Sequence, residues 1–147
     1  MITTDLLQYT ISGVTIGVIY ALVAIGYNIV YNVTEIINFA QGEFVMLGGL
    51  LAVFFVGPLG FPIPLAFAAA VAGAGILGFA MERFVIRRAR SASVLSLIII
   101  TIALSILLKG GAMLGWGKDP YSLPAFSRGG PIMAAGAAVQ PQALWIL

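Results

Sequence analysis

The 147-residue sequence contains no cysteine and no histidine, and only 8% of its residues are charged. The absence of cysteine excludes disulfides and thiolate metal sites. Without histidine, hydrolases that rely on a Ser–His or Cys–His pair are excluded, as is a zinc peptidase built on two histidines. No glycine-rich stretch ends in Gly-Lys followed by Ser or Thr, so the chain has no Walker loop for ATP. We therefore expect no enzyme, no cofactor and no metal site.

Charge is scarce because long stretches of the chain are apolar. The composition is 61% hydrophobic with a mean hydropathy of +1.11, whereas ordinary soluble domains are roughly 25% charged. No charged residue occurs between Leu6 and Thr34, or between Phe44 and Met81. A helix needs only about 20 apolar residues to cross a hydrocarbon core of about 30 Å. The sequence therefore predicts an integral membrane protein with an all-α fold, a polytopic transmembrane helix bundle.

The apolar stretches predict four complete spans and the start of a fifth, within one transmembrane domain that covers residues 1–147. Gly57, Pro58 and Pro62 divide the second long stretch, because such residues end helices and form turns. The Pro, Gly and Ser content after the fourth span favours a loop or a short helix over another span. The predicted spans are approximately 6–31, 36–56, 64–81 and 93–116, followed by an extracytoplasmic segment at 118–142 and the start of the next span at 143–147.

Arginine is concentrated in one short loop, ERFVIRRARS. Short loops rich in arginine remain on the cytoplasmic side of a membrane. We predict that the N-terminus and the 58–62 loop lie outside and the 32–35 turn inside. This topology explains the net charge of +2, so we expect membrane lipid and no nucleic acid among the partners. The predicted cytoplasmic positive loop contains Arg83, Arg87, Arg88 and Arg90.

Glu43 is the most informative residue, because it lies only a few residues inside a predicted span. If that span begins as a helix at Ile36, a rise of 1.5 Å per residue places Glu43 roughly 10 Å inside the hydrocarbon boundary. A carboxylate there costs on the order of 2.5 kcal/mol or more. The side chain must therefore face protein or water, either as a structural hydrogen-bonding group or as a pathway or coupling residue.

Two overlapping helix-start signals precede Glu43. Asn32 with Glu35 has the spacing of an N-terminal capping pair, and Asn38 with Gln41 repeats it. Two competing starts within so short a distance predict an irregular beginning of the second span. Transporters place such breaks where the N-termini of half-helices point at substrate.

Other polar side chains lie in the first and fourth predicted spans. Lys109 is near the predicted outer end of its span, where its long stem can reach the interface. An ion pair between Lys109 and Glu43 is not expected, because the predicted topology places them toward opposite sides. Tyr20, Tyr27 and Asn28 line the first span, where packing, interfacial and pathway roles all remain open.

The stretch GVTIGVIYALVAIGYNIVYNVTEIINFAQGEFVMLGG, from Gly13 to Gly49, resembles the opening of the permease subunits of bacterial branched-chain amino acid ABC importers of the LivH-like type. Its central motif is INFAQGE, from Ile37 to Glu43, followed by Met46 to Gly48. Many relatives carry His where this sequence has Gln41. The ERFVIRRAR loop is also similar, so the resemblance covers nearly the whole chain. Because such permeases are considerably longer, the resemblance corresponds to their N-terminal half, and we expect this chain to be an N-terminal portion, a truncated gene product or one piece of a split permease.

The resemblance implies a multi-pass permease subunit of the bacterial inner membrane that forms the translocation path for branched-chain or related amino acids. It also implies three kinds of partner: a second permease subunit, cytoplasmic ABC ATPases and a periplasmic substrate-binding protein. Two alternatives remain open, a small proton-coupled four-span exporter with Glu43 as its proton site and a noncatalytic membrane assembly subunit. The candidate translocation-path or coupling residues are Asn38, Phe39, Gln41, Gly42, Glu43, Tyr20, Tyr27 and Asn28.

Overall fold

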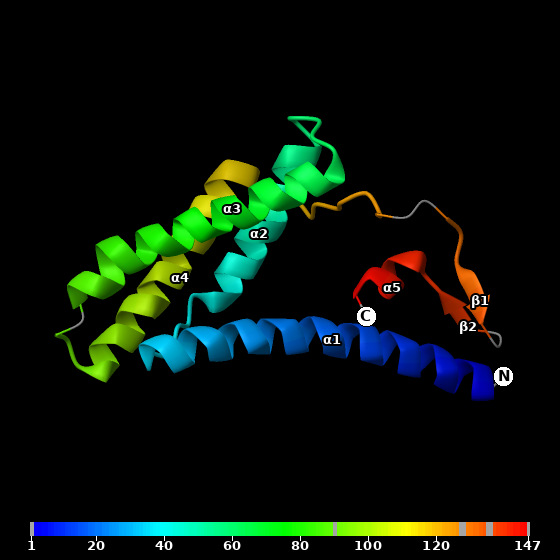
Figure 1. The fold of residues 1–147 in the computed structure, drawn as a ribbon, viewed down its shortest axis with the longest axis horizontal. Helices are drawn as coiled ribbons and strands as arrows, with labels where there is room; N and C mark the ends of the chain where they lie inside the picture. The colour runs from blue at the N-terminus through cyan, green and yellow to red at the C-terminus, as the bar shows by residue number, and fades with distance from the viewer. Residues whose placement is uncertain (1, 90, 127–128, 135–136, 147) are drawn as a thin grey trace. The chain divides into compact units, whose positions relative to one another are not determined.

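The computed structural model describes residues 2–89, 91–126, 129–134 and 137–146, and these are mostly helical (Figure 1). Residues 1–26 and 124–147 form one compact unit, and residues 27–123 form a second. The first helix contributes residues to both units. In chain order the elements are α1 (Ile2–Thr34), α2 (Gln41–Val56), α3 (Ile63–Met81), α4 (Val94–Trp116), β1 (Ile132–Ala134), β2 (Ala137–Val139) and α5 (Pro141–Ile146).

Three helical segments of the described chain are long and apolar enough to cross a membrane: Asp5–Thr34, Ile63–Ala89 and Val94–Trp116. Helix α2 has only 16 residues, or about 24 Å of helix, which is less than the roughly 30 Å of a hydrocarbon core. The predicted second span at 36–56 is therefore not one continuous helix, and four complete spans are not confirmed. Large apolar side chains cover the outer surfaces of these helices, as expected for a multi-pass membrane protein.

The helix ends follow from local sequence. Helix α1 stops where Glu35 adopts a φ of 54° and its backbone N–H donates to the Tyr31 carbonyl oxygen at 2.7 Å. Helix α3 is preceded by an extended Pro62. Helix α4 begins at Ser93, whose hydroxyl accepts from the Ser96 N–H, and ends at Gly117 with a φ of 84°. These are the capping arrangements that proline, serine and glycine favour.

The second unit is organised around α2, which packs against both α3 and α4. Gly73 on α3 permits close approach, because a Cβ there would lie 3.0 Å from Cδ1 of Leu51. At the far end of α2, the Phe54 ring meets the Trp116 ring of α4 edge-on. The small core between these helices contains Leu47, Ala66, Ala70, Leu97 and Ala112.

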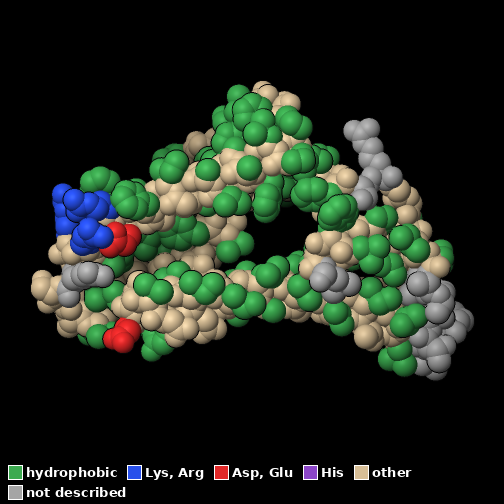
Figure 2. Space-filling view, in the orientation of Figure 1, with side chains coloured by type: hydrophobic (Ala, Val, Ile, Leu, Met, Phe, Trp, Pro, Cys, Tyr) green, Lys and Arg blue, Asp and Glu red, His purple; other side chains and the backbone are tan. Residues whose placement is uncertain are grey.

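The arginine-rich loop continues α3 as a π-helical turn, Glu82–Ile86, and a 3₁₀ turn, Arg87–Ala89. The Arg87 Nε atom lies 3.2 Å from Glu82 Oε1, and the Arg88 guanidinium lies 6.0 Å from the Phe84 ring centroid. Figure 2 shows the basic side chains gathered at this end of α3. Arg90 lies outside the described residues.

The first unit contains a β-hairpin that the sequence did not predict. Strands β1 and β2 are antiparallel, with Ile132 opposite Val139. The side-chain amide of Gln8 on α1 pairs with the backbone of Ala138: Nε2 donates to the carbonyl oxygen at 3.2 Å and Oε1 accepts from the N–H at 2.8 Å. The segment at 118–142, predicted as a loop or short helix, therefore contains a two-stranded antiparallel sheet that two hydrogen bonds join to Gln8. Helix α5 follows it, and Leu147 lies outside the described residues.

Candidate functional site

Residues 35–40 interrupt the helical path between α1 and α2, which confirms the predicted irregular start. The Asn38 side chain forms the turn that leads into α2, because its Oδ1 accepts from the Ala40 N–H at 3.0 Å. The Gln41 N–H then donates to the Asn38 carbonyl oxygen at 3.2 Å. Ala40, the residue before the helix, is fully buried and supplies no side-chain cap. An asparagine turn of this kind lets the backbone change direction with its polar groups paired.

Thr101 on α4 forms a hydrogen bond to the non-helical segment at 35–40. It is fully buried, and its Oγ1 accepts from the Phe39 N–H at 3.3 Å. The hydroxyl donates to the Ile98 carbonyl oxygen at 2.9 Å within its own helix, and the Ile37 carbonyl oxygen lies 3.5 Å away. A backbone N–H that lies outside a helix in an apolar protein needs such a partner. Thr101 therefore stabilises a break that hydrocarbon alone would not tolerate.

Glu43 and Lys109 form an ion pair, with 2.9 Å between Lys109 Nζ and Glu43 Oε1. The Glu43 side chain is 7% exposed and that of Lys109 is 60% exposed. The expectation that these residues would not pair is wrong, and so is the interpretation of Lys109 as a residue that extends to the membrane interface. Its ammonium is instead directed to a buried carboxylate. Ser105, one turn earlier on α4, lies within hydrogen-bonding reach of the same carboxylate.

Glu43 does not lie seven residues into a helix as predicted, because α2 begins at Gln41 rather than Ile36. Glu43 lies in the first turn of α2, where a carboxylate is favoured by the helix dipole. Side chains of a helix lean toward its N-terminus, so Lys109 reaches Glu43 at about the level of Ser105. Ser105 is halfway along α4, whose far end meets α2 through Phe54 and Trp116. Helices α2 and α4 therefore run in the same direction, and α2 begins beside the first half of α4.

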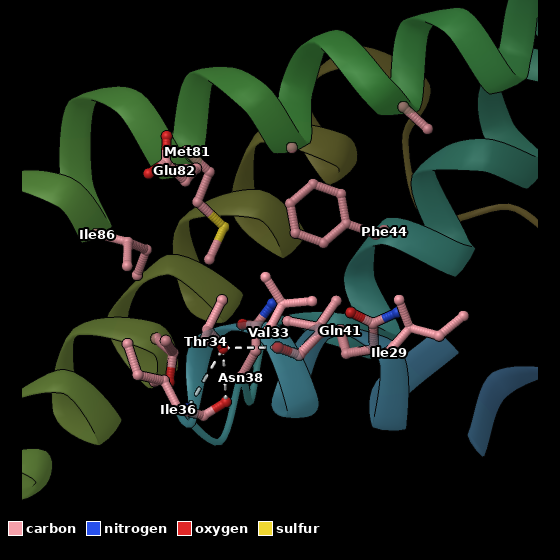
Figure 3. Close-up of a pocket in the computed structure, with 14 residues that line it drawn as sticks. Ile29, Val33, Thr34, Ile36, Asn38, Gln41, Phe44, Met81, Glu82 and Ile86 are labelled. Atoms are coloured by element: carbon pink, nitrogen blue, oxygen red, sulfur yellow. Dashed lines mark hydrogen bonds between the residues drawn. The ribbon is translucent and has the colours of Figure 1, made fainter. Parts of the chain in front are cut away.

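A cavity of about 510 Å³ lies next to the start of α2, within the second unit. Its walls are mostly apolar, with a few polar groups beside the break. Figure 3 shows Phe44 and Met81 on one side of it, and Val33, Asn38 and Gln41 on the facing side. The lining residues are Ile29, Val30, Val33, Thr34, Ile36, Asn38, Gln41, Phe44, Ala74, Gly78, Met81, Glu82, Ile86 and Thr101. An apolar cavity with a few convergent polar groups suits a small molecule with an aliphatic part.

The structure brings some of the predicted site residues together and not others. Asn38 and Gln41 line the cavity. Phe39 does not line it and is 51% exposed, but its backbone N–H donates to Thr101. Gly42 is exposed, with open space where a Cβ would lie. Tyr27 and Asn28 lie on α1 before the first lining residue, Ile29. Tyr20 belongs to the first unit. No cluster of acidic side chains suited to a metal occurs among the described residues.

Three residues of α4 contact the non-helical segment or the first turn of α2, and the sequence did not predict these contacts. Thr101, Ser105 and Lys109 are spaced four residues apart and therefore lie on one face of a helix. We call these three residues the anchor strip. Polar residues at this spacing on an otherwise apolar helix were a visible signal, because buried polar groups in membrane helices need partners. The residues that they contact, Phe39 and Glu43, could not be identified from this pattern, since they lie more than sixty positions earlier in the chain.

A multi-pass helical protein in which a helix starts after a non-helical segment and beside an apolar cavity has the architecture of many membrane transport proteins. The comparison with protein families agrees with this class. Residues 9–147 match the family described as the permease component of the branched-chain amino acid transport system. The chain belongs to this family.

Two curated relatives illustrate the similarity. The chain is 34% identical over 131 residues to the high-affinity branched-chain amino acid transport system permease protein BraD of Pseudomonas aeruginosa, covering 84% of this chain and 43% of that protein. It is equally similar to LivH of Escherichia coli K12, covering 84% of this chain and 42% of that protein. The chain thus spans less than half the length of these relatives. No solved structure matches it.

Proposed function

We propose that this chain is the N-terminal part of a permease subunit of an ABC importer for branched-chain or related amino acids. The observation that carries the proposal is the start of α2 after a non-helical segment, beside α4 and an apolar cavity. Non-helical backbone is tolerated at membrane depth only where protein buries it or where it lines a cavity. Half-helix starts at such a place form the substrate sites of many transporters.

The cavity has the chemistry for an aliphatic amino acid. Its walls supply apolar contact for a branched side chain, and Asn38, Gln41 and Thr101 supply polar groups at the break. We assign Asn38 and Gln41 to the translocation path and Glu43 to the support of that path. Phe39 and Gly42 complete the motif around the break. Tyr20, Tyr27 and Asn28 are proposed path residues on α1.

The proposed assembly contains a second permease subunit, cytoplasmic ABC ATPases and a periplasmic substrate-binding protein, in the bacterial inner membrane. The positive-inside rule supports a cytoplasmic position for the loop after α3, because Arg83, Arg87, Arg88 and Arg90 are concentrated there. The cavity, which includes Glu82 and Ile86 near this loop, then lies in the cytoplasmic half of the permease. ATP binding and hydrolysis in the partner would drive the exchange between outward-facing and inward-facing states.

The proton-coupled exporter is less well supported, because it needs Glu43 as a membrane carboxylate free to exchange a proton. Glu43 is instead paired with Lys109, and the family of the chain is described as the permease component of a branched-chain amino acid transport system. The assembly-subunit alternative offers no reason for an internal cavity beside a broken helix. The importer therefore accounts for more of the site than either alternative.

Affinity capture of the native protein from its own membranes in mild detergent tests the proposal. We expect an ABC ATPase and a second permease in the captured complex, identified by mass spectrometry. After reconstitution, ATP hydrolysis should be stimulated by a binding protein loaded with a branched-chain amino acid. Capture of a self-associated protein without any ATPase would overturn the proposal.

A further inference from the structure

The ion pair between Glu43 and Lys109 has an unusual setting, because the two side chains differ so much in exposure. Glu43 is almost completely buried, whereas more than half of the Lys109 side chain is exposed. A buried carboxylate without a partner is costly, so the start of α2 depends on the ammonium of Lys109. Lys109 is outside the motif that identified the site.

The other two members of the anchor strip contact the same short stretch of chain. Thr101 accepts the hydrogen bond of the Phe39 N–H, and Ser105 lies beside the Glu43 carboxylate. One face of α4 therefore contacts the chain both before and after the turn at Ala40. Because α4 is a continuous helix of 23 residues, it provides a rigid reference for a segment that has no helical hydrogen bonds of its own.

We propose that Lys109 is a positioning residue whose ion pair with Glu43, supported by Thr101 and Ser105, determines where α2 begins and thereby sets Asn38 and Gln41 at the cavity wall. Without the ammonium, Glu43 is a buried carboxylate without a countercharge at the first turn of α2. The least costly relief is movement of residues 35–43 toward water, which displaces both lining residues. The consequence for transport rests on the proposed function, whereas the structural role does not.

The lack of cysteine makes this movement measurable. The 147 residues contain no thiol, so Ala40→Cys introduces a single reporter into this part of the chain. Ala40 is fully buried and directly precedes α2, so its thiol should react slowly with a maleimide as long as the start of α2 is in place. The labelling rate is measured in membranes that contain the complete transporter, with any other cysteine of the full-length protein replaced.

Lys109→Met should raise the labelling rate of the Ala40→Cys reporter by on the order of tenfold, because the segment loses its charged partner. Uptake should fall in parallel. Lys109→Arg retains a cation that reaches the carboxylate, so labelling and uptake should remain near those of the parent. Lys118→Met, in the loop after α4, is the matched control for loss of a lysine and should change neither. Equal protection in the Lys109→Met variant and the parent would overturn the proposal, as would strong labelling of the Lys109→Arg variant.

If the Lys109→Met variant does not insert correctly into the membrane, exchanging the charges of Glu43 and Lys109 provides a second test. The Glu43→Lys, Lys109→Glu double variant should label more slowly than Glu43→Lys alone, because the exchange restores an ion pair. Recovery should be incomplete, since a cation at the start of a helix is opposed by the helix dipole. Equal labelling of the single and double variants would show that the pair does not position α2. The labelling result does not depend on substrate, so a parent transporter that takes up no branched-chain amino acid would refute only the proposed function.

Discussion

The ring of Phe54 near the end of α2 meets the ring of Trp116 at the end of α4, with centroids 6.3 Å apart and planes at 81°. Edge-on contact between aromatic rings is favourable beyond the area that it buries. The contact makes the two helices end level with each other. Since α2 is seven residues shorter than α4, the whole difference in length falls at the start of α2. The contact and the Glu43–Lys109 ion pair thus fix the two ends of the short helix.

Trp116 provides the first prediction. Its indole Nε1 is buried without a hydrogen-bond partner among the described residues, so Trp116→Phe removes an unpaired donor while a ring remains against Phe54. The thermal stability of the protein in detergent should be unchanged or higher. Trp116→Ala loses the ring and should destabilise by about 2 kcal/mol, less than the roughly 3–5 kcal/mol of a fully buried Trp, because Trp116 is only partly buried. Leu114→Ala, at a position that is 92% exposed on the same helix, is the control and should have little effect. Equal losses in the Phe and Ala variants would contradict this account.

Thr101 provides the second prediction. Thr101→Val preserves the shape of the side chain but leaves the Phe39 N–H without its partner, which should cost about 1–3 kcal/mol. The control is Thr10→Val, because the Thr10 hydroxyl is exposed and donates to the Leu6 carbonyl oxygen of its own helix. Thermal unfolding of both variants in detergent measures the difference. Similar midpoints for the two variants would mean that the break does not depend on Thr101.

The sequence predicted α3 and α4 closely because their limits are encoded locally. The expected spans at 64–81 and 93–116 agree with Ile63–Met81 and Val94–Trp116 to within one residue at each end. A continuous apolar run lies between clear end signals in both cases, with Pro64 at the first turn of α3 and Ser93 capping α4. Local composition and capping chemistry are sufficient for such helices.

The start of α2 and the hairpin could not be predicted in the same way. Residues 36–40 are mostly apolar, so hydropathy extends the helix through them. Their departure from the helix is stabilised by Thr101 and Lys109, which are distant in sequence. The motif did indicate that Asn38, Gln41 and Glu43 were special, but their partners on α4 required the packed structure. Strands β1 and β2 have three residues each, which is too short for an alternating pattern to be recognised.

Glu35 provides the third prediction. Its φ of 54° is unfavourable for any residue with a Cβ, and glycine is preferred at this position after a helix. Glu35→Gly should therefore relieve roughly 1–2 kcal/mol of backbone strain, partly offset by about 0.5–1 kcal/mol for the greater freedom of glycine in the unfolded chain, so the protein should become slightly more stable. Glu35→Ala removes the same carboxylate but keeps the Cβ, so it should produce no such gain. The measurement is again the thermal midpoint in detergent, and an equal rise in both variants would show that the carboxylate, not the backbone, is the source of strain.

The cavity beside α2 provides the last prediction, because it connects the geometry with transport. Ala74 lines the cavity, whereas Ala72 is exposed on the same helix and is not among the lining residues. Ala74→Phe should fill much of the space that an aliphatic amino acid would use, and Ala72→Phe adds the same ring outside it. We expect uptake of a branched-chain amino acid by the reconstituted transporter to fall on the order of tenfold or more in the Ala74→Phe variant, and to stay near the parent value in the Ala72→Phe variant.

The cause of that loss can be separated from a folding defect by measuring ATP hydrolysis in the same preparations. A transporter that still assembles with its ATPase should retain basal hydrolysis in both variants, while the stimulation by loaded binding protein is lost only when the cavity is filled. Loss of basal hydrolysis in the Ala74→Phe variant alone would indicate disrupted packing of α3, and a smaller substitution, Ala74→Leu, would then be used. Full uptake with a phenylalanine at position 74 would mean that substrate does not pass through this cavity, because the ring and an aliphatic side chain would compete for the same volume.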